Sequence, residues 1–320
     1  MTFQFLIMSI VISNSRDDVE FSAEMTRRQF AALKLKINRT SVLNELKSLK
    51  YFKKLRKSLK FETNIFSKWI RNGWNTEHIL RLTPTLFSDD ELIYALQWAF
   101  PQSYYSVYTI FLGFLNTQGY QQTSHRSVLR LFGELISQNK FPKTVSFYAK
   151  NVNPIEFVNI TKYPTDFPLY FDSSSDESIE TQICQFLKAT REMELKDRRI
   201  DMKKEFRTKK GKVKRHLTKE NWEKVSGNFG YTTVLNLLYR KRIKANYRDI
   251  EPFLSNNINA QEVYDNIIKI TSLLNFVFEI YSARAIGFKN LNNVAKQLIK
   301  KGYSFLEKRL ELIENNLSSF

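Results

Sequence analysis

Apolar residues recur with a helical period in three long stretches of the chain, 103–116, 125–136 and 263–286. In the first stretch the residues that share one helical face are Tyr104, Val107, Tyr108, Phe111, Leu112 and Leu115. In the second they are Val128, Leu131, Phe132, Leu135 and Ile136. Because isolated helices of this length are marginal in water, the pattern predicts helices that bury one another in a mostly α-helical bundle.

Polar residues mark where these helices begin and end. Gly119 favours a C-terminal stop, because glycine adopts the left-handed conformation that ends helices. Thr123 and Ser124 are favourable N-cap residues for the second helix. The acidic segment 88–91 suits the N-terminus of a further helix, and Pro101 predicts that this helix breaks or kinks before the next one begins.

The remaining chain alternates between irregular and helical patterns. Proline, asparagine and serine indicate irregular chain over 150–176, and mixed charges at helical spacing indicate a solvated helix after residue 188. We expect a helix with a hinge over 217–239 and a last amphipathic helix over 295–317. The expected parts are a basic helical extension at 1–81, the first half of the bundle at 82–149, a loop and basic insertion at 150–216, and the second half with a C-terminal helix at 217–320.

Charge narrows the class of partner. The 320 residues include 50 Lys and Arg against 32 Asp and Glu, a net charge of +18 at pH 7. This excess favours a polyanionic partner, which could be RNA, DNA or an acidic membrane face, with a basic composition that has no function as the alternative. The helical pattern at 27–60 has a basic face that suits either solvent or a phosphate backbone, and 203–215 has the composition of a mobile basic arm.

Several other classes of site lack support. The single cysteine, Cys184, excludes an intramolecular disulfide, and the three histidines are far apart, so no metal site is predicted. No nucleotide-binding or cofactor motif is present, and no cofactor is predicted.

The apolar segment 1–13 is too short to span a bilayer. We expect a buried strand or helix there; the alternatives are a signal or anchor segment, or a start at Met25. A cytoplasmic protein with no membrane partner is expected.

Two blocks of residues resemble a family pattern. The first block is Ser103-Tyr104-Tyr105, Gly119, Thr123 to Ser127 and Leu131-Phe132-Gly133, and the second is Arg242, Ala245, Asn246 and Tyr247. In order and spacing they resemble the HEPN superfamily, helical bundles common in bacterial toxin, defence and nucleotidyltransferase-associated proteins. Asn246 replaces an Asp of that pattern, and a long stretch separates the two blocks. The resemblance implies an elaborated HEPN-like bundle with an N-terminal helical extension.

The same resemblance implies an RNA-binding homodimer in a toxin–antitoxin, stress or antiviral (phage-defence) setting. If the chain is an enzyme, it is expected to be a metal-independent endoribonuclease. HEPN nucleases pair Arg with His, but Tyr247 follows Arg242 here, so His125 is the substitute considered and activity stays open. The segment Arg71–His78 matches an R-x6-H motif away from the family position. The candidate catalytic residues are Arg242, His125, Tyr247 and Asn246.

Two alternatives remain at the level of sequence. One is a catalytically silent HEPN-like scaffold that binds a nucleotide or a protein partner, such as an antitoxin or nucleotidyltransferase; the other is a basic DNA-binding protein. A nuclease should bring Arg242 near a proton-transferring group, whereas a scaffold should hold it in an ion pair, with Asp249 as the expected partner. The candidate nucleic-acid-binding residues are Lys203, Lys204, Arg207, Lys209, Lys210, Lys212, Lys214, Arg215, Arg240 and Lys241.

Overall fold

The computed structural model describes residues 16–121, 123–152, 154–160, 171–208, 210–212, 214, 216–227, 229–245 and 258–318. Within these ranges the α-helices are α1 (Arg16–Lys36), α2 (Arg39–Ser48), α3 (Lys50–Lys53), α4 (Thr63–Leu86), α5 (Asp89–Thr117), α6 (His125–Ser137), α7 (Asp176–Met202), α8 (Lys219–Ser226), α9 (Val234–Ile243), α10 (Ala260–Ile286), α11 (Phe288–Ile299) and α12 (Ser304–Leu317). The other elements are the 3-10 helix η2 (Lys143–Val145) and the strands β1 (Tyr148–Lys150), β2 (Glu156–Val158) and β3 (Thr232–Thr233).

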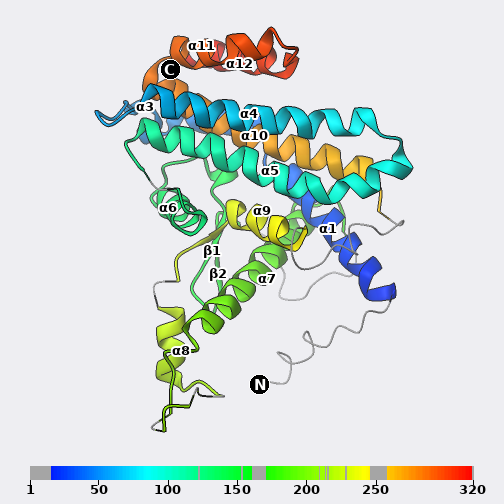
Figure 1. Ribbon diagram of the computed structural model, residues 1–320, viewed down its shortest axis with the longest axis vertical. Helices are drawn as coiled ribbons and strands as arrows, with labels where there is room; N and C mark the ends of the chain where they lie inside the picture. Colours follow the sequence, from blue (N-terminus) through cyan, green and yellow to red (C-terminus); the bar gives the residue numbers. More distant parts are fainter. Residues whose placement is uncertain are drawn as a thin grey trace.

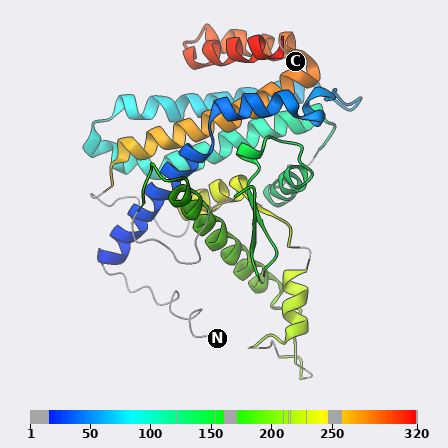
Figure 2. The same ribbon diagram turned by 180° about the vertical axis from the view of Figure 1, so that it is seen from behind.

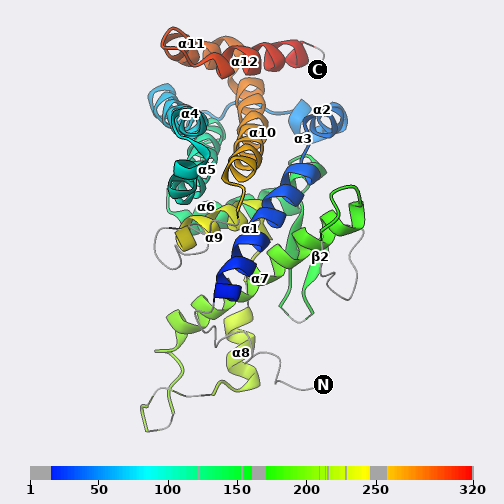
Figure 3. The same cartoon turned by 90° about the vertical axis from the view of Figure 1, so that its right-hand side faces the viewer.

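The predicted mostly α-helical class is confirmed. Helices α4, α5 and α10 lie side by side, α11 and α12 cover one edge of this group, and α6, α9, α1 and α7 lie beyond the other edge (Figures 1 and 3). The Ser103 hydroxyl contacts the Thr271 hydroxyl at 2.7 Å, and Asn275 donates to Ser106 at 2.8 Å. These contacts show that α5 and α10 run in the same direction, which joins segments that are distant in the sequence.

Helices α4 and α5 approach each other closely at two glycines. A Cβ added at Gly73 would lie 2.5 Å from Ile110 Cγ1, and one added at Gly113 would lie 2.6 Å from Ile70 Cδ1. Real Cβ atoms do not tolerate such distances, so a side chain at either position would require the neighbouring isoleucine, or the helix that carries it, to shift. The two glycines therefore allow α4 and α5 to pack this closely.

Of the break or kink predicted at Pro101, the break is wrong, because α5 is a single helix that contains this proline. Proline removes one backbone hydrogen bond from a helix interior. Here the residues around it, including Ala99, Phe100 and Tyr104, are buried against neighbouring helices. We attribute the unbroken helix to this burial, which outweighs the local cost of the proline. The predicted acidic N-terminus is confirmed: Ser88 and Glu91 form a capping box.

Residues 150–176 were predicted to be irregular, yet they contribute to a small antiparallel sheet with the order β2-β1-β3. Tyr148 pairs with Val158 on one side and Thr233 on the other. The buried guanidinium of Arg191 on α7 holds the sheet edge, donating to the carbonyls of Ala149 (3.3 Å) and Gly230 (3.1 Å). Figure 2 shows these strands between α6 and α7. Strands this short carry too few residues for a period-2 pattern to be visible in the sequence.

Two predicted C-terminal helices are each divided in the structure. The segment 217–239 forms α8, β3 and the first part of α9, and 295–317 spans the end of α11 and all of α12. Between α11 and α12, Gly302 has a φ of +92°, a conformation that favours glycine and reverses the chain. The closing core helix predicted at 263–286 is confirmed as α10.

A fully buried ion network, here called the Arg309 junction, attaches α12 to the core. Arg309 donates to Glu77 Oε2 on α4 at 2.8 Å and to Glu279 Oε1 on α10 at 2.9 Å. Trp74 Nε1 donates to the same Glu279 oxygen at 2.8 Å, and Asn275 donates to Glu77 at 2.7 Å. Burial acts to raise the pKa of both carboxyls; the arginines Arg309 and Arg81 outweigh it at Glu77, whose pKa falls to about 2, whereas that of Glu279 is raised.

Some predictions concern residues or questions that the structure does not address. The apolar segment 1–13 lies outside the described residues. The division into four parts stays a prediction, and α4 continues across the boundary placed at residue 81. Over the described ranges, no helix is both long and apolar enough to cross a bilayer.

Candidate functional site

Arg242 and His125 meet in a group of aromatic side chains that we call the tyrosine cluster. Its tyrosines are Tyr104, Tyr105 and Tyr108 on α5 and Tyr239 on α9. The His125 ring lies 4.6–6.0 Å from all four tyrosine rings, measured between centroids. The Arg242 guanidinium lies 4.9 Å from the centre of the Tyr105 ring and 5.6 Å from that of Tyr239. The two candidate catalytic residues therefore contact the same aromatic groups.

Local structure places each member of the cluster. Tyr104 and Tyr108 are four residues apart and so share one face of α5. His125 is the first residue of α6, held there because the Ser124 N-cap accepts a hydrogen bond from Ser127 N. The Tyr108 hydroxyl donates to the carbonyl of Thr123, which fixes the chain just before α6. The predicted N-cap position at Ser124 is thereby confirmed.

His125 is half-buried and is held toward its neutral form. Tyr104 Oη and His125 Nδ1 are 2.8 Å apart, and either atom can be the donor, depending on the tautomer. Burial lowers the pKa of His125, and the positive charge of Arg242 lowers it further. Burial raises the pKa of Tyr104 well above its ordinary value, so Tyr104 remains a neutral phenol. The ring nitrogen Nε2 can therefore accept a proton near neutral pH when Nδ1 carries the hydrogen.

Arg242 is bound by aromatic groups. Its Nη2 donates to Tyr105 Oη at 2.5 Å, and its Nε is buried without a hydrogen-bond partner. Over the described residues it makes no ion pair with a carboxylate; Asp249, the partner expected of a scaffold, lies outside them, as do Asn246 and Tyr247. The guanidinium contacts of Arg242 that the structure describes thus leave its charge without a nearby anion.

The prediction from the sequence identified only some of the residues that form the tyrosine cluster. Arg242 and His125 were candidates, and the structure brings them together. The tyrosine hydroxyls were missed as parts of the site, although Tyr104 and Tyr105 belong to the block that resembles the family. The available signal was the spacing: two tyrosines four residues apart on one predicted helix, followed by a histidine at the start of the next. The other half of the cluster, Tyr239 with Arg242 three residues later on α9, is visible only once the fold brings α9 against α5.

The predicted nucleic-acid-binding residues fall into two groups. Lys203, Lys204, Arg207, Lys210 and Lys212 are exposed on a segment between α7 and α8, called here the basic arm (203–216), which lies at the far end of the molecule from α11 and α12 (Figure 1). Lys214 is partly exposed and donates to Asn221, and Lys209 and Arg215 lie outside the described residues.

Arg240 and Lys241 belong to the second group, because Arg240 turns toward α7 and Lys241 toward α1 and α7, away from solvent. Lys241 is only 6% exposed and donates to Thr26 at 2.8 Å. Arg240 donates to Thr190 at 3.0 Å and lies 5.9 Å from the Phe186 ring centre. The two residues are adjacent at the end of α9, whose inner face packs on α7. Their basic side chains suggested an exposed position, so the sequence did not indicate that they are turned inward. Their placement removes Lys241 from any phosphate-binding surface.

Residues of the basic arm that the structure describes pair with one another through their backbones, and the mobility that composition suggested stays a prediction. Lys214 N donates to the carbonyl of Phe206 and Thr208 N to that of Lys212, at 2.8 and 2.7 Å. Gly211 has a φ of +75° at the turn, and Phe206 is buried. Backbone pairing therefore presents the lysines in a defined turn.

A second exposed basic surface runs from the end of α2 through α3 into the loop that precedes α4. Between Leu46 and Phe61 there are seven Lys and Arg and no Asp or Glu. The helical pattern predicted over 27–60 is divided among α1, α2 and α3 and ends at Lys53. The loop that follows contacts the end of α5, where Ser58 N donates to the carbonyl of Thr117 at 2.7 Å. We call residues 47–60 the basic loop.

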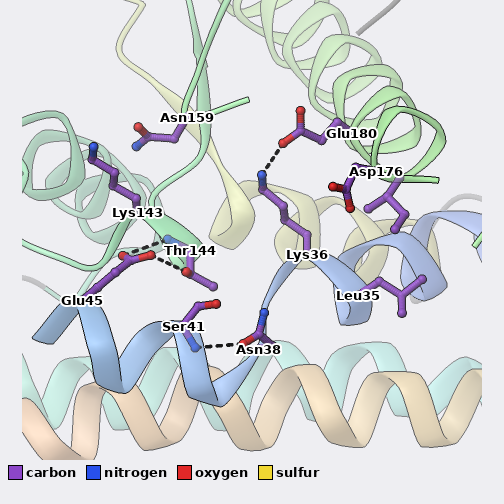
Figure 4. A pocket seen from close by; sticks show the side chains of 11 residues that line it. Leu35, Lys36, Asn38, Ser41, Glu45, Lys143, Thr144, Asn159, Asp176 and Glu180 are labelled. Carbon is purple, nitrogen blue, oxygen red and sulfur yellow. Dashed lines mark hydrogen bonds and ion pairs between the residues drawn. The ribbon is translucent and has the colours of Figure 1, made fainter. Parts of the chain in front are cut away.

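A polar cavity of about 430 Å³ lies between α1, α2, η2 and the start of α7 (Figure 4). Its polar groups largely bind one another. Lys36 pairs with Glu180, and Glu45 accepts hydrogen bonds from the amide and hydroxyl of Thr144 at 3.2 and 2.6 Å. None of the predicted site residues lines it, and we base the functional assignment on the tyrosine cluster.

Other candidates are explained by structure. Cys184 is buried, and burial raises the pKa of its thiol to about 12, as expected of an unreactive core residue. In the Arg71–His78 match, the His78 ring stacks on Tyr303 at 3.7 Å. Among the residues that the structure describes, no group of three or more His, Cys, Asp or Glu side chains could hold a metal ion.

Comparison of the chain with protein-family models, curated proteins and solved structures finds no match.

Proposed function

We propose that this protein binds RNA through its basic arm and basic loop, and cleaves it without a metal ion at the tyrosine cluster. One observation carries the proposal: Arg242 from α9 and a histidine of lowered pKa from the start of α6 share the same tyrosines. The resemblance to HEPN proteins adds the setting of toxin, stress or phage defence.

The proposed reaction is an in-line attack by the ribose 2′ oxygen on the adjacent phosphorus. His125 Nε2 takes the proton of the 2′ hydroxyl while the O2′–P bond forms, in the tautomer whose Nδ1 donates to Tyr104 Oη. The P–O5′ bond breaks, and the 5′ oxygen receives the hydroxyl proton of Tyr105. Arg242 stabilises the charge on the phosphorane and on the Tyr105 oxygen to which it donates. The products are a 2′,3′-cyclic phosphate and a 5′ hydroxyl.

Charge supports RNA binding outside the cluster. The arm contains eight Lys and Arg and a single Glu between 203 and 215. Each phosphate that a cation neutralises releases counterions, so affinity should fall steeply with salt.

The first test is cleavage of a mixed RNA pool in EDTA by the wild type, Arg242→Ala, His125→Ala and Tyr105→Phe. We expect cutting that leaves cyclic phosphate ends, and a rate lower by about 100-fold or more in each variant, the range of a lost acid–base or charge-stabilising group. Tyr94→Phe, an exposed tyrosine elsewhere on α5, is the control and should cut normally. Equal cutting by Arg242→Ala would contradict the assigned site.

Binding is measured separately, so that catalysis and recognition can fail independently. Lys210→Ser with Lys212→Ser should lower RNA affinity and reduce the salt dependence, by about 0.7 in the log–log slope for each lost contact to a single strand. Lys300→Ser with Lys301→Ser, exposed between α11 and α12, is the matched control. RNA binding without cleavage would favour the silent scaffold, and a preference for duplex DNA would favour a DNA-binding protein. If the protein neither binds nor cleaves nucleic acid, its net positive charge has no role in binding nucleic acid.

A further inference from the structure

The end of the molecule opposite α11 and α12 is a lobe made of the last two turns of α7, the basic arm, α8 and residues 227–230 (Figures 1 and 3). We call it the distal lobe (195–230). Its sequence contains thirteen Lys and Arg against five Asp and Glu. Phe206 and Val225 in this lobe are buried, but neither belongs to the large hydrophobic cluster of the helical bundle. The lobe therefore packs around a small centre of its own beneath a positively charged surface.

Two aromatic rings of this lobe pair with arginines of α7. The Arg199 guanidinium lies 5.2 Å from the centre of the Trp222 ring. The Arg198 guanidinium lies 5.8 Å from the centre of the Phe229 ring, and its Nη2 donates to the carbonyl of Gly227 at 2.8 Å. All four residues that form these pairs are partly exposed. We call them the arginine–aromatic platform: Arg198, Arg199, Trp222 and Phe229.

The platform arginines form no ion pair with any carboxylate that the structure describes: Arg198 binds a backbone carbonyl, and Arg199 faces an indole ring. An aromatic face attracts a guanidinium but does not neutralise it. Guanidinium planes and aromatic rings are the groups on which proteins stack unpaired RNA bases, and positive charge beside them binds the adjoining phosphates. The platform therefore has the chemistry of a base-binding surface.

The platform adjoins both the basic arm and the helix that carries His125. Asp201, one turn beyond the platform arginines on α7, pairs with Arg126 at 3.0 Å, and Arg126 follows His125 in the first turn of α6. Lys214 of the arm donates to Asn221, the residue before the platform tryptophan, at 3.2 Å. These contacts place the platform between the residues proposed to hold phosphates and those proposed to cleave.

We propose that the arginine–aromatic platform binds unpaired RNA bases by stacking, so that single-stranded RNA is the form of RNA that this protein binds. The inference rests on the proposed function and names its substrate class. In a duplex the bases stack on one another inside the helix and present no face to Trp222 or Arg198. The lysines of the arm contact the phosphates of any strand, whereas the platform requires bases that are free to leave the stack.

Affinity for a strand that cannot be cleaved tests the platform directly. The probe is a 2′-O-methyl oligouridine of about 20 nucleotides, which lacks the attacking hydroxyl. Trp222→Leu should weaken its binding about 5- to 150-fold, the loss of one stacked base, whereas Trp222→Phe should stay within about threefold of the wild type. Trp98→Leu, at a tryptophan that is 57% exposed on α5, is the matched control and should bind normally. Equal binding by Trp222→Leu and the wild type would overturn the proposal.

Two further measurements separate stacking from charge and from folding. The slope of log affinity against log salt should be the same in Trp222→Leu as in the wild type, because no phosphate contact is lost, whereas Lys210→Ser with Lys212→Ser should reduce it. An abasic strand of the same length should bind Trp222→Leu and the wild type equally. Weaker binding of the abasic strand by Trp222→Leu would assign the tryptophan to the folding of the lobe and overturn the proposal.

Cleavage of single and double strands separates this inference from the proposed function. The wild type should cut single-stranded RNA and leave a perfect duplex of the same sequence uncut. Cutting of both forms at similar rates would refute the role of the platform and leave the proposed nuclease standing. Binding that depends on Trp222 without any cutting would support the platform and contradict catalysis. A wild type that binds neither the oligouridine nor the mixed RNA pool would refute both.

Discussion

Arg309 and Arg242 show two ways in which this fold holds a guanidinium. Arg309 is 4% exposed and is bound by two carboxylates from different helices. Arg242 is half-buried and is surrounded by the rings of Tyr104, Tyr105 and Tyr239. One arginine closes a core, and the other lies beside a half-buried histidine at the junction of three helices.

The two arginines differ in the groups that balance the guanidinium charge. At the Arg309 junction the carboxylates compensate the cation and the cation stabilises them. The network is therefore complete without a ligand except at Glu279 Oε2 and Asn275 Oδ1, which have no hydrogen-bond partner among the described residues. In the tyrosine cluster, aromatic faces attract Arg242 but do not neutralise it, and its field reaches His125. A buried ion pair is therefore expected to matter for folding, and the cluster for binding an anion.

The largest effect is expected from Arg309→Met. This change leaves Glu77 and Glu279 buried without their shared cation, and breaking a buried pair from one side costs about 3–5 kcal/mol. Urea denaturation should show this loss together with detachment of α11 and α12, detected as faster hydrogen exchange in those helices. Arg130→Met, which removes an exposed pair with Glu134, is the control and should cost less than about 1 kcal/mol. Equal losses of stability in Arg309→Met and Arg130→Met would show that the junction contributes no more to stability than an exposed ion pair.

The acid side of the stability profile tests the same junction with a smaller effect. The pKa of Glu77 is about 2 in the folded protein against an ordinary value of 4.5, so its contribution is complete above pH 4.5 and is lost as the pH falls toward 2. The loss should be about 3 kcal/mol. Glu279 has a raised pKa and acts in the opposite direction at higher pH. Between pH 2 and 6 the urea midpoint should depend less on pH in Glu77→Gln than in the wild type. An unchanged pH dependence would contradict the low pKa of Glu77.

Arg242→Met should affect stability less than either change at the junction. It removes one hydrogen bond to Tyr105 and the contacts with aromatic rings, worth about 1–2 kcal/mol together. RNA cleavage should nevertheless be abolished if the proposed function holds. Thermal denaturation beside the cleavage assay separates the two roles. A stability loss as large as that of Arg309→Met would place Arg242 with the structural arginines and favour a scaffold.

How far the sequence predicted the fold depends on the length of each element. The apolar period located α6 and α10 and the second half of α5, because each buries a stripe several turns long. Pro101 suggested a break that burial overrides, and β1, β2 and β3 have two or three residues each, too few for a pattern. Gly302 was not recognised as a chain reversal, since apolar residues on both sides continue a helical pattern.

The site was predictable only in part for a related reason. Arg242 and His125 were named by residue type, whereas their proximity depends on how α9 packs against α5. Lys241 and Arg240 had the same basic composition as the arm, yet one face of α9 is buried and the other is not. Local sequence therefore identified the chemistry, and only tertiary packing distinguished the cation that can meet a ligand from the cation that is buried.

The smallest effect concerns the charge on His125. Its pKa should lie below the ordinary value of 6.5, because burial and the positive charge of Arg242 both disfavour the imidazolium. Removing the charge in Arg242→Gln should raise the pKa of His125. Lys241→Gln, a change at the adjacent residue, whose ammonium binds Thr26 on α1, should leave that pKa nearly unchanged. Titration of the ring proton resonances by NMR measures both shifts, with His125→Gln to assign the signal. Since the lowered pKa keeps the ring neutral in the folded state, its contribution to stability is complete above pH 6.5 and declines as the pH falls. A pKa above 6.5, or one insensitive to Arg242, would mean that the two side chains do not act on each other and would remove the electrostatic basis for treating them as one site.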